Sequence, residues 1–142
     1  MAMRWMSNRI YSHEKDRKMM TLLLTGAGAA VPTFVAATTK GIASIAWTAT
    51  GILDIQFGNI VNGITLPDLY TRFLGLSVTP SLVGTYTAAS SVVNAYVVAA
   101  NNAISTTGIM RIQLISGTGV AANLVASELL YLTFTFGDSS AV

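Results

Sequence analysis

Hydrophobic and polar positions alternate along several short stretches of this chain, and turn residues separate the stretches. Leu53, Ile55 and Phe57, for example, alternate with Asp54 and Gln56. Successive side chains of a β-strand point to opposite faces of the sheet, so this alternation predicts strands with one buried face. Extended helical periodicity is missing. The pattern therefore predicts an all-β chain.

The expected strands are rich in Val, Ile, Thr and aromatic residues and are bounded by glycine, proline or asparagine. They comprise residues 21–25, 31–38, 40–50, 52–57, 70–79, 92–100, 108–115 and 128–136. The third and fourth form a hairpin across Thr50-Gly51. We expect a loop around Gly58 and Asn62. Pro80 is expected to end its strand, because proline cannot donate in a central ladder.

Seven to nine strands with short connections predict antiparallel sheets, because parallel strands need long crossovers. The expected fold class is an all-β, antiparallel two-sheet sandwich or jelly roll with an N-terminal arm. The 142 residues suffice for one domain with a core. Residues 1–20 are expected to form a basic N-terminal arm, and residues 21–142 a single β-sandwich domain.

Charge is concentrated at one end of the chain. Residues 1–20 hold five basic and two acidic side chains, whereas residues 21–142 hold three basic and four acidic ones. An ordinary soluble surface carries charge on roughly a quarter or more of its positions. Together with a mean hydropathy of +0.59, this scarcity of charge indicates a surface that protein copies or lipid cover.

Several function classes are disfavoured by composition. The chain has no cysteine, which excludes disulfides and thiolate metal sites. Its few basic residues form no groove for nucleic acid. The apolar run 19–37 is interrupted by Gly26, Gly28 and Pro32, which argues against a spanning helix. We therefore expect neither direct nucleic-acid binding nor membrane insertion.

A secreted protein is an open alternative. The charged residues 15–18 precede an apolar run, and small residues at 27–30 or 35–37 could serve as cleavage contexts. Against it, the charged region is long and partly acidic.

Candidate catalytic groups are sparse. His13 is the single histidine and lies in the expected arm, so residues 21–142 cannot assemble a Ser/His/Asp triad. Asp54 and Glu128 could form a carboxylate pair if their strands were neighbours. Glycine pairs at 26–28 and 117–119 fit turns better than phosphate loops, and Trp47 fits the core. We expect no enzyme activity and no cofactor.

Four segments carry a resemblance to a known family. They are Thr-Ala-Thr-Gly-Ile-Leu-Asp-Ile (48–55), Tyr-Thr-Arg-Phe-Leu-Gly-Leu-Ser-Val (70–78), residues 112–124 and Glu-Leu-Leu-Tyr-Leu-Thr-Phe (128–134). Their layout resembles small bacteriophage capsid cement (decoration) proteins with a jelly-roll fold. The resemblance implies a structural virion protein on the outer capsid surface, a dimer or trimer that clamps major capsid protein subunits. The charged leader departs from a compact decoration domain.

We expect the arm to contact the major capsid protein, with arginines bonding capsid carboxylates. The expected contact residues are Arg4, Trp5, Arg9, Tyr11, Arg17 and Lys18. Self-association is expected through an uncharged sheet face. Two alternatives remain open at this stage: another virion module such as a tail, spike or receptor-binding protein, and a secreted or outer-membrane β protein.

Overall fold

The structure is a computed structural model, and it describes residues 17–35, 41–70, 72–81, 86–98 and 104–137. Within these ranges the chain forms nine β-strands and no helix. The strands make two sheets, and all of their hydrogen-bonded strand pairs are antiparallel. The expected all-β class with two antiparallel sheets is confirmed.

The first sheet, here the β1–β9 sheet, has the strand order β2-β1-β9-β6. Its strands are β1 (Arg17–Ala27), β2 (Ala30–Thr33), β6 (Arg72–Ser81) and β9 (Leu129–Gly137). The first and last strands pair along their whole common length, from Arg17 opposite Gly137 to Thr25 opposite Leu129.

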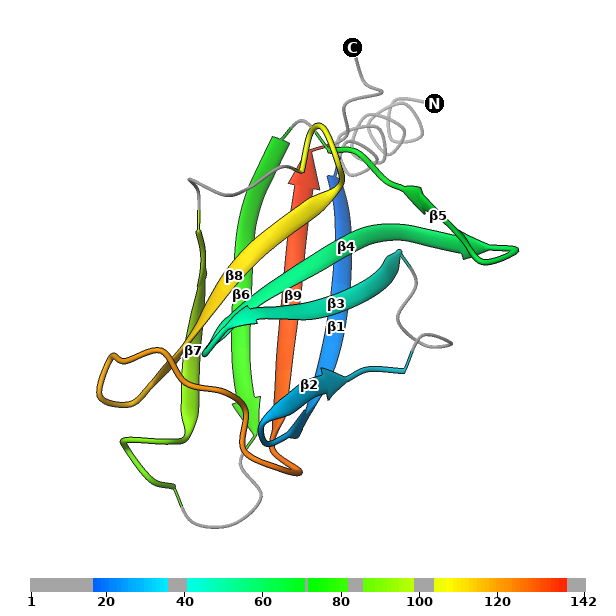
Figure 1. Cartoon of the computed structure of the whole chain (residues 1–142). Helices are drawn as coiled ribbons and strands as arrows, with labels where there is room; N and C mark the ends of the chain where they lie inside the picture. The colour runs from blue at the N-terminus through cyan, green and yellow to red at the C-terminus, as the bar shows by residue number, and fades with distance from the viewer. Residues whose placement is uncertain (1–16, 36–40, 71, 82–85, 99–103, 138–142) are drawn as a thin grey trace, which may run out of the picture.

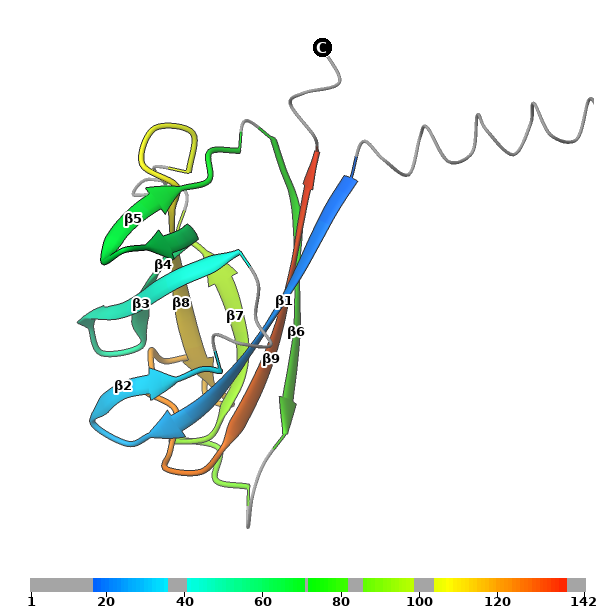
Figure 2. The same ribbon diagram turned by 90° about the vertical axis from the view of Figure 1, so that its right-hand side faces the viewer.

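The second sheet, here the β4–β8 sheet, has the order β3-β4-β8-β7, and β5 extends it by pairing with β4. Its strands are β3 (Ile42–Ala49), β4 (Ile52–Val61), β5 (Ile64–Pro67), β7 (Val92–Val97) and β8 (Ile109–Ser116). The two sheets lie face to face, and the strands of one run obliquely across those of the other (Figures 1 and 2).

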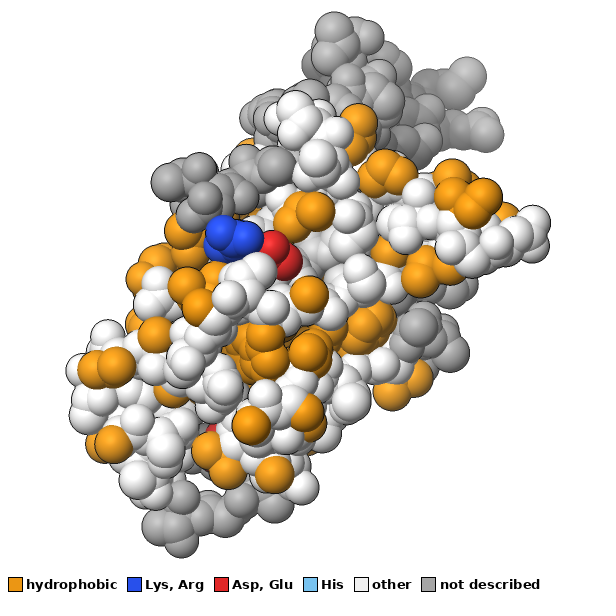
Figure 3. Space-filling model, in the orientation of Figure 1, with side chains coloured by type: hydrophobic (Ala, Val, Ile, Leu, Met, Phe, Trp, Pro, Cys, Tyr) orange, Lys and Arg blue, Asp and Glu red, His pale blue; other side chains and the backbone are white. Residues whose placement is uncertain are grey.

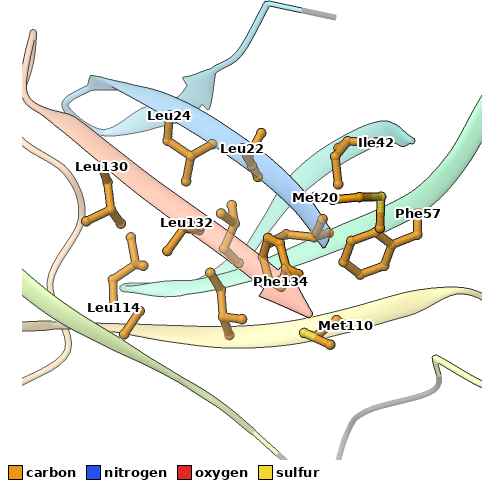
Figure 4. Close-up of a cluster of buried hydrophobic side chains, with 14 of the residues drawn as sticks. Met20, Leu22, Leu24, Ile42, Phe57, Met110, Leu114, Leu130, Leu132 and Phe134 are labelled. Atoms are coloured by element: carbon orange, nitrogen blue, oxygen red, sulfur yellow. The ribbon is translucent and has the colours of Figure 1, made fainter. Parts of the chain in front are cut away.

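A cluster of apolar side chains fills the space between the sheets (Figure 4). Alternate residues of β1 and β9 point into it from one side, and alternate residues of β4 and β8 from the other. The largest fully buried members are Phe57, Phe134, Phe136, Leu22, Leu24, Leu53, Ile55, Met110, Ile112, Leu114, Leu124 and Leu130. Each such side chain stabilises the fold by about 1.5–3 kcal/mol relative to an exposed one. Plain alternation of the expected strands 52–57, 108–115 and 128–136 puts these buried positions on one face of each strand, and β4, β8 and β9 confirm that pattern.

Two strands depart from the expected alternation because each contains a β-bulge. In β6 the register shifts between Phe73 and Gly75, so that Phe73, Leu76 and Val78 all pack on the core and Leu74 is exposed. The sequence pattern had placed Phe73 and Leu76 on opposite faces. A bulge inserts one extra residue and reverses the alternation that follows it.

Strand β3 has two register shifts against β4, one between Trp47 and Ala49 and the other, which changes its inward face, between Ile42 and Ser44. That second shift brings Ile42 to the core side together with Ile45 and Trp47, whereas plain alternation had separated Ile42 from those two. Trp47 is half-buried against the core, and its Nε1–H donates to the carbonyl of Ala30 at 2.9 Å.

Pro80 does not end its strand, since β6 continues to Ser81. Strand β6 is the outer strand of its sheet and pairs with β9 alone, where Pro80 lies opposite Leu130. A proline on an edge strand breaks no ladder when its nitrogen faces away from the sheet. The expectation failed because it assumed a central strand.

Candidate interaction surfaces

The residues expected to contact a capsid divide into two groups. Arg4, Trp5, Arg9 and Tyr11 lie outside the described residues, as does His13. Arg17 and Lys18 belong to β1, so the sheet begins four residues before the expected boundary of the domain. The earlier start follows from Met20, which is 6% exposed and belongs to the core. Its burial continues the alternation of Leu22 and Leu24 toward the N-terminus.

Lys18 is bound within its own chain. Its Nζ lies 3.8 Å from Asp68 Oδ2 and 5.2 Å from the centroid of the Tyr70 ring. Tyr70 also donates a long hydrogen bond to Asp68 Oδ2 at 3.5 Å and stacks on Phe136 at 4.1 Å. Both charged side chains of the pair are partly exposed, so the ion pair is worth about 0–1 kcal/mol. A capsid carboxylate would have to compete with Asp68 for this ammonium.

Burial raises the pKa of the Tyr70 phenol, and the nearby Lys18 opposes that shift without cancelling it. The phenol is therefore protonated at neutral pH, which suits its role as a hydrogen-bond donor to Asp68. Asp68, Tyr70 and Lys18 thus fasten the start of β1 to the segment that follows β5. No local pattern in the sequence indicates this junction, because its residues come from distant segments of the chain.

Register brings a second arginine next to Arg17. Arg17 and Arg72 both lie opposite Gly137, one on each side of β9. The same row of the β1–β9 sheet therefore carries two arginines from strands that are 55 positions apart in the sequence.

Beyond that row, the outer face of the β1–β9 sheet is uncharged. Outward positions of β1, β9 and β6 lie side by side in four successive rows. The rows are Met19–Thr135–Gly75, Thr21–Thr133–Ser77, Leu23–Tyr131–Thr79 and Thr25–Leu129–Ser81. Met19 is 67% exposed and Tyr131 40%. This surface, here the threonine face, fits the uncharged sheet face expected from composition.

The outer face of the β4–β8 sheet has a different character. Asp54 and Arg111 form a two-pronged ion pair across β4 and β8, with N–O distances of 2.7 and 2.9 Å. The hydrogen bond to Asp54 raises the pKa of the Arg111 guanidinium further. Beside this pair, Tyr96 Oη donates to Gln113 Oε1 at 2.6 Å. Basic and acidic side chains are nonetheless scarce on this side of the molecule (Figure 3).

Asp54 and Glu128 do not form a carboxylate pair. Asp54 lies on the outer face of the β4–β8 sheet, whereas Glu128 directly precedes β9 in the other sheet and is 5% exposed. The Glu128 Oε1 accepts a long hydrogen bond from Ser91 Oγ at 3.5 Å, and its Oε2 is buried with no hydrogen-bond partner. The pairing considered from sequence required neighbouring strands, and β4 and β9 are in different sheets.

The charged side chains that the structure describes are all engaged inside the chain. Lys18 pairs with Asp68, Arg111 pairs with Asp54, and Glu128 is buried. Of these described side chains, none is therefore both exposed and without an ion pair; the side chains of Arg17 and Arg72 are not among those described.

A β-ribbon formed by the end of β4 and by β5, residues 58–67, projects from the sandwich (Figures 1 and 3). Its register pairs Gly58 with Pro67 and Val61 with Ile64, and its residues 59–67 are all exposed. Its turn residues, Asn62 and Gly63, have φ values of 52° and 77°. We call this element the β4–β5 ribbon.

The loop expected around Gly58 and Asn62 is wrong, because the β4–β5 ribbon lies there. The missed signal was Asn62-Gly63, since the dipeptide Asn-Gly favours the type I′ turn of a two-residue hairpin. The flanking pairs Ile60-Val61 and Ile64-Thr65 have high strand propensity. The expectation failed because no alternation of buried and exposed positions marks the ribbon, whose residues 59–67 are all exposed.

Among the described residues, no group of three or more His, Cys, Asp or Glu side chains could hold a metal ion. A search of the same residues for a helix long and apolar enough to cross a membrane also finds none.

Comparisons with known proteins give no relative. No protein-family model matches the chain, and neither a curated protein nor a solved structure is detectably similar to it.

Proposed function

We propose that this chain is a structural virion protein that binds the outer surface of a phage head and bridges major capsid protein subunits. The observation that carries the proposal is the uncharged threonine face, which four rows of three residues build across β1, β9 and β6. Neutral hydroxyl side chains can be desolvated against a partner for the cost of a hydrogen bond, whereas a buried charge costs several kcal/mol unless it is paired.

The strand order supports a jelly-roll relationship. The first and last strands of the described chain, β1 and β9, pair in the first sheet, and β4 pairs with β8 in the second. The chain crosses between the sheets four times, from β2 to β3, from β5 to β6, from β6 to β7 and from β8 to β9. Nested wrapping of this kind is what a jelly roll requires, and jelly rolls are common in viral capsid domains.

In this proposal the threonine face packs on a second copy, which gives a dimer or trimer. The basic N-terminal segment, with Arg4, Trp5, Arg9 and Tyr11, lies on the neighbouring capsid protein. Arg17 and Arg72 extend its positive charge onto the end of the sheet. Many weak, identical contacts on a lattice add up through avidity, so a small neutral domain can hold a shell together.

Binding to stripped phage heads tests the proposal. We expect the full-length chain to co-sediment with heads, and the double variant Arg4→Gln and Arg9→Gln to bind at least about tenfold more weakly because charge-assisted bonds are lost. If that variant bound heads as well as the wild type, the proposed contact between the arm and the capsid protein would be wrong.

A matched pair of variants tests the threonine face. Thr21 and Thr48 are both exposed strand threonines, on the outer faces of the β1–β9 and β4–β8 sheets respectively. Thr21→Lys should disrupt self-association, whereas Thr48→Lys should leave it intact. Equal behaviour of the two variants would argue against a contact through this face.

A further inference from the structure

We propose that the β4–β5 ribbon is a self-docking element whose Val61, Ile64 and Leu66 side chains pack against the same side chains of a second copy of this chain. The contact is separate from the threonine face, and it does not depend on the proposed role in a capsid.

Register sorts the ribbon's residues into two faces. Directly opposite residues of an antiparallel pair share a face, and neighbours along a strand alternate. Val61 pairs with Ile64, and Asn59 pairs with Leu66, so these four residues share one face. Ile60 pairs with Thr65 on the other. One face is therefore mainly apolar, and the other carries a single large apolar side chain.

The apolar face of the ribbon is uncovered. Leu53, Ile55 and Phe57, at the alternate positions of β4 that lead to Val61, are fully buried beneath the β1–β9 sheet. Val61, Ile64 and Leu66 are 48%, 63% and 51% exposed. A two-stranded ribbon is at best marginally stable alone in water and needs a packed face. Natural edge strands usually carry charges that prevent pairing, and this ribbon has none.

The absence of charge indicates a second copy as the partner. No charged residue occurs between Asp54 and Asp68. In a two-fold contact the residues at the axis meet their own counterparts, so a charge placed there would meet a like charge. An uncharged apolar face can pack on its own copy because it brings no like charges together. A foreign protein surface would ordinarily bring charges, which this ribbon could not pair.

The contact is small compared with the roughly 1,600 Å² of a standard interface. It should therefore give a dimer that dissociates on dilution. Combined with the threonine face, such a contact would link oligomers into a larger array.

The two faces of the ribbon supply a matched experiment. Ile60 and Ile64 are both exposed, at 56% and 63%, and they stand on opposite faces of the same two strands. Sedimentation equilibrium of the full-length chain is measured for the wild type, Ile64→Asp and Ile60→Asp. We expect Ile64→Asp to weaken the ribbon-dependent association step at least about tenfold, with Ile60→Asp close to the wild type.

A second pair of variants, with a less disruptive substitution, keeps the test valid if the aspartate variants fail to fold. Ile64→Thr and Ile60→Thr keep a β-branched side chain and should show the same contrast, while a retained cooperative thermal transition reports that each variant is folded. Equal effects of the two substitutions, or association unchanged by Ile64→Asp, would overturn the proposal. So would an Ile64→Asp variant that associates normally but no longer binds phage heads, because the ribbon's partner would then be a different protein.

Discussion

Glu128 is a buried carboxylate with one oxygen that has no hydrogen-bond partner. It is 5% exposed, its Oε2 has no hydrogen-bond partner, and the bond from Ser91 Oγ to its Oε1 is 3.5 Å long. A buried carboxylate without a cation loses hydration, and here one long hydrogen bond to Oε1 replaces it only in part. Its backbone carbonyl, in contrast, is hydrogen-bonded: it accepts from the Gly26 N–H at 2.7 Å. The main-chain hydrogen bond holds residue 128 in place, whereas the buried charge of its side chain lowers the stability of the fold.

Glu128→Gln should therefore stabilise the protein. The amide keeps an oxygen acceptor for Ser91 and removes the buried charge, and an unpaired neutral group costs less than an unpaired charged one. We expect a gain of about 1–2 kcal/mol at neutral pH, seen as a rise of several degrees in Tm by calorimetry. Glu128→Ala is the control, since it removes the charge and also the acceptor. A lower Tm for Glu128→Gln would show that the carboxylate has a partner or function of its own.

At the scale of the element, the β4–β5 ribbon depends on Gly58. This residue has a φ of 138°, and a Cβ placed on it would collide with the carbonyl oxygen of Leu66 on the partner strand. Two strands approach here more closely than a side chain permits. Gly75, in the bulged part of β6, has open space around it and no positive φ.

Gly58→Ala should consequently loosen the ribbon, whereas Gly75→Ala should be tolerated. We expect Gly58→Ala to cost about 2 kcal/mol or more and Gly75→Ala to stay within about 0.5 kcal/mol of the wild type. Amide hydrogen exchange is the measurement, because it should report lost protection in β5 while β1 and β9 stay protected. Matching exchange in the two variants would contradict the role given to Gly58.

Local alternation predicted the strands whose two faces differ in burial. Strands β4, β8 and β9 were anticipated with their inward residues, because Leu53, Met110 and Leu132 alternate with polar or smaller side chains. The pattern failed at the bulges of β3 and β6, where one extra residue reverses the faces. It also failed at the β4–β5 ribbon, where neither face is buried and the turn dipeptide was the sole guide.

The candidate surfaces were less predictable, because they depend on register between distant strands. Composition predicted an uncharged sheet face, but only the pairing of β1 with β9 and β6 assembles the threonine face. Contacts between distant segments also create the row that holds Arg17 and Arg72, and the junction of Lys18 with Asp68. Lys18 was assigned to the arm from its charge alone, although the buried Met20 beside it places this segment in the sheet.

At the scale of the molecule, as far as the structure describes it, the central feature is a well-packed sandwich whose described surface carries little charge. The charged side chains described by the structure pair with each other or are buried, which leaves the threonine face and the β4–β5 ribbon as surfaces without electrostatic preference. Contacts through such surfaces should resist high salt, because screening acts on charges and leaves apolar burial in place. Contacts made by the basic N-terminal segment should weaken as salt is added.

The most direct test of this account is sedimentation of the full-length protein, first alone and then mixed with stripped phage heads. The account predicts a symmetric dimer or trimer that persists at high salt, co-sediments with the heads and raises the temperature at which they release their DNA. A monomer at every concentration, left in the supernatant by the heads, would contradict it.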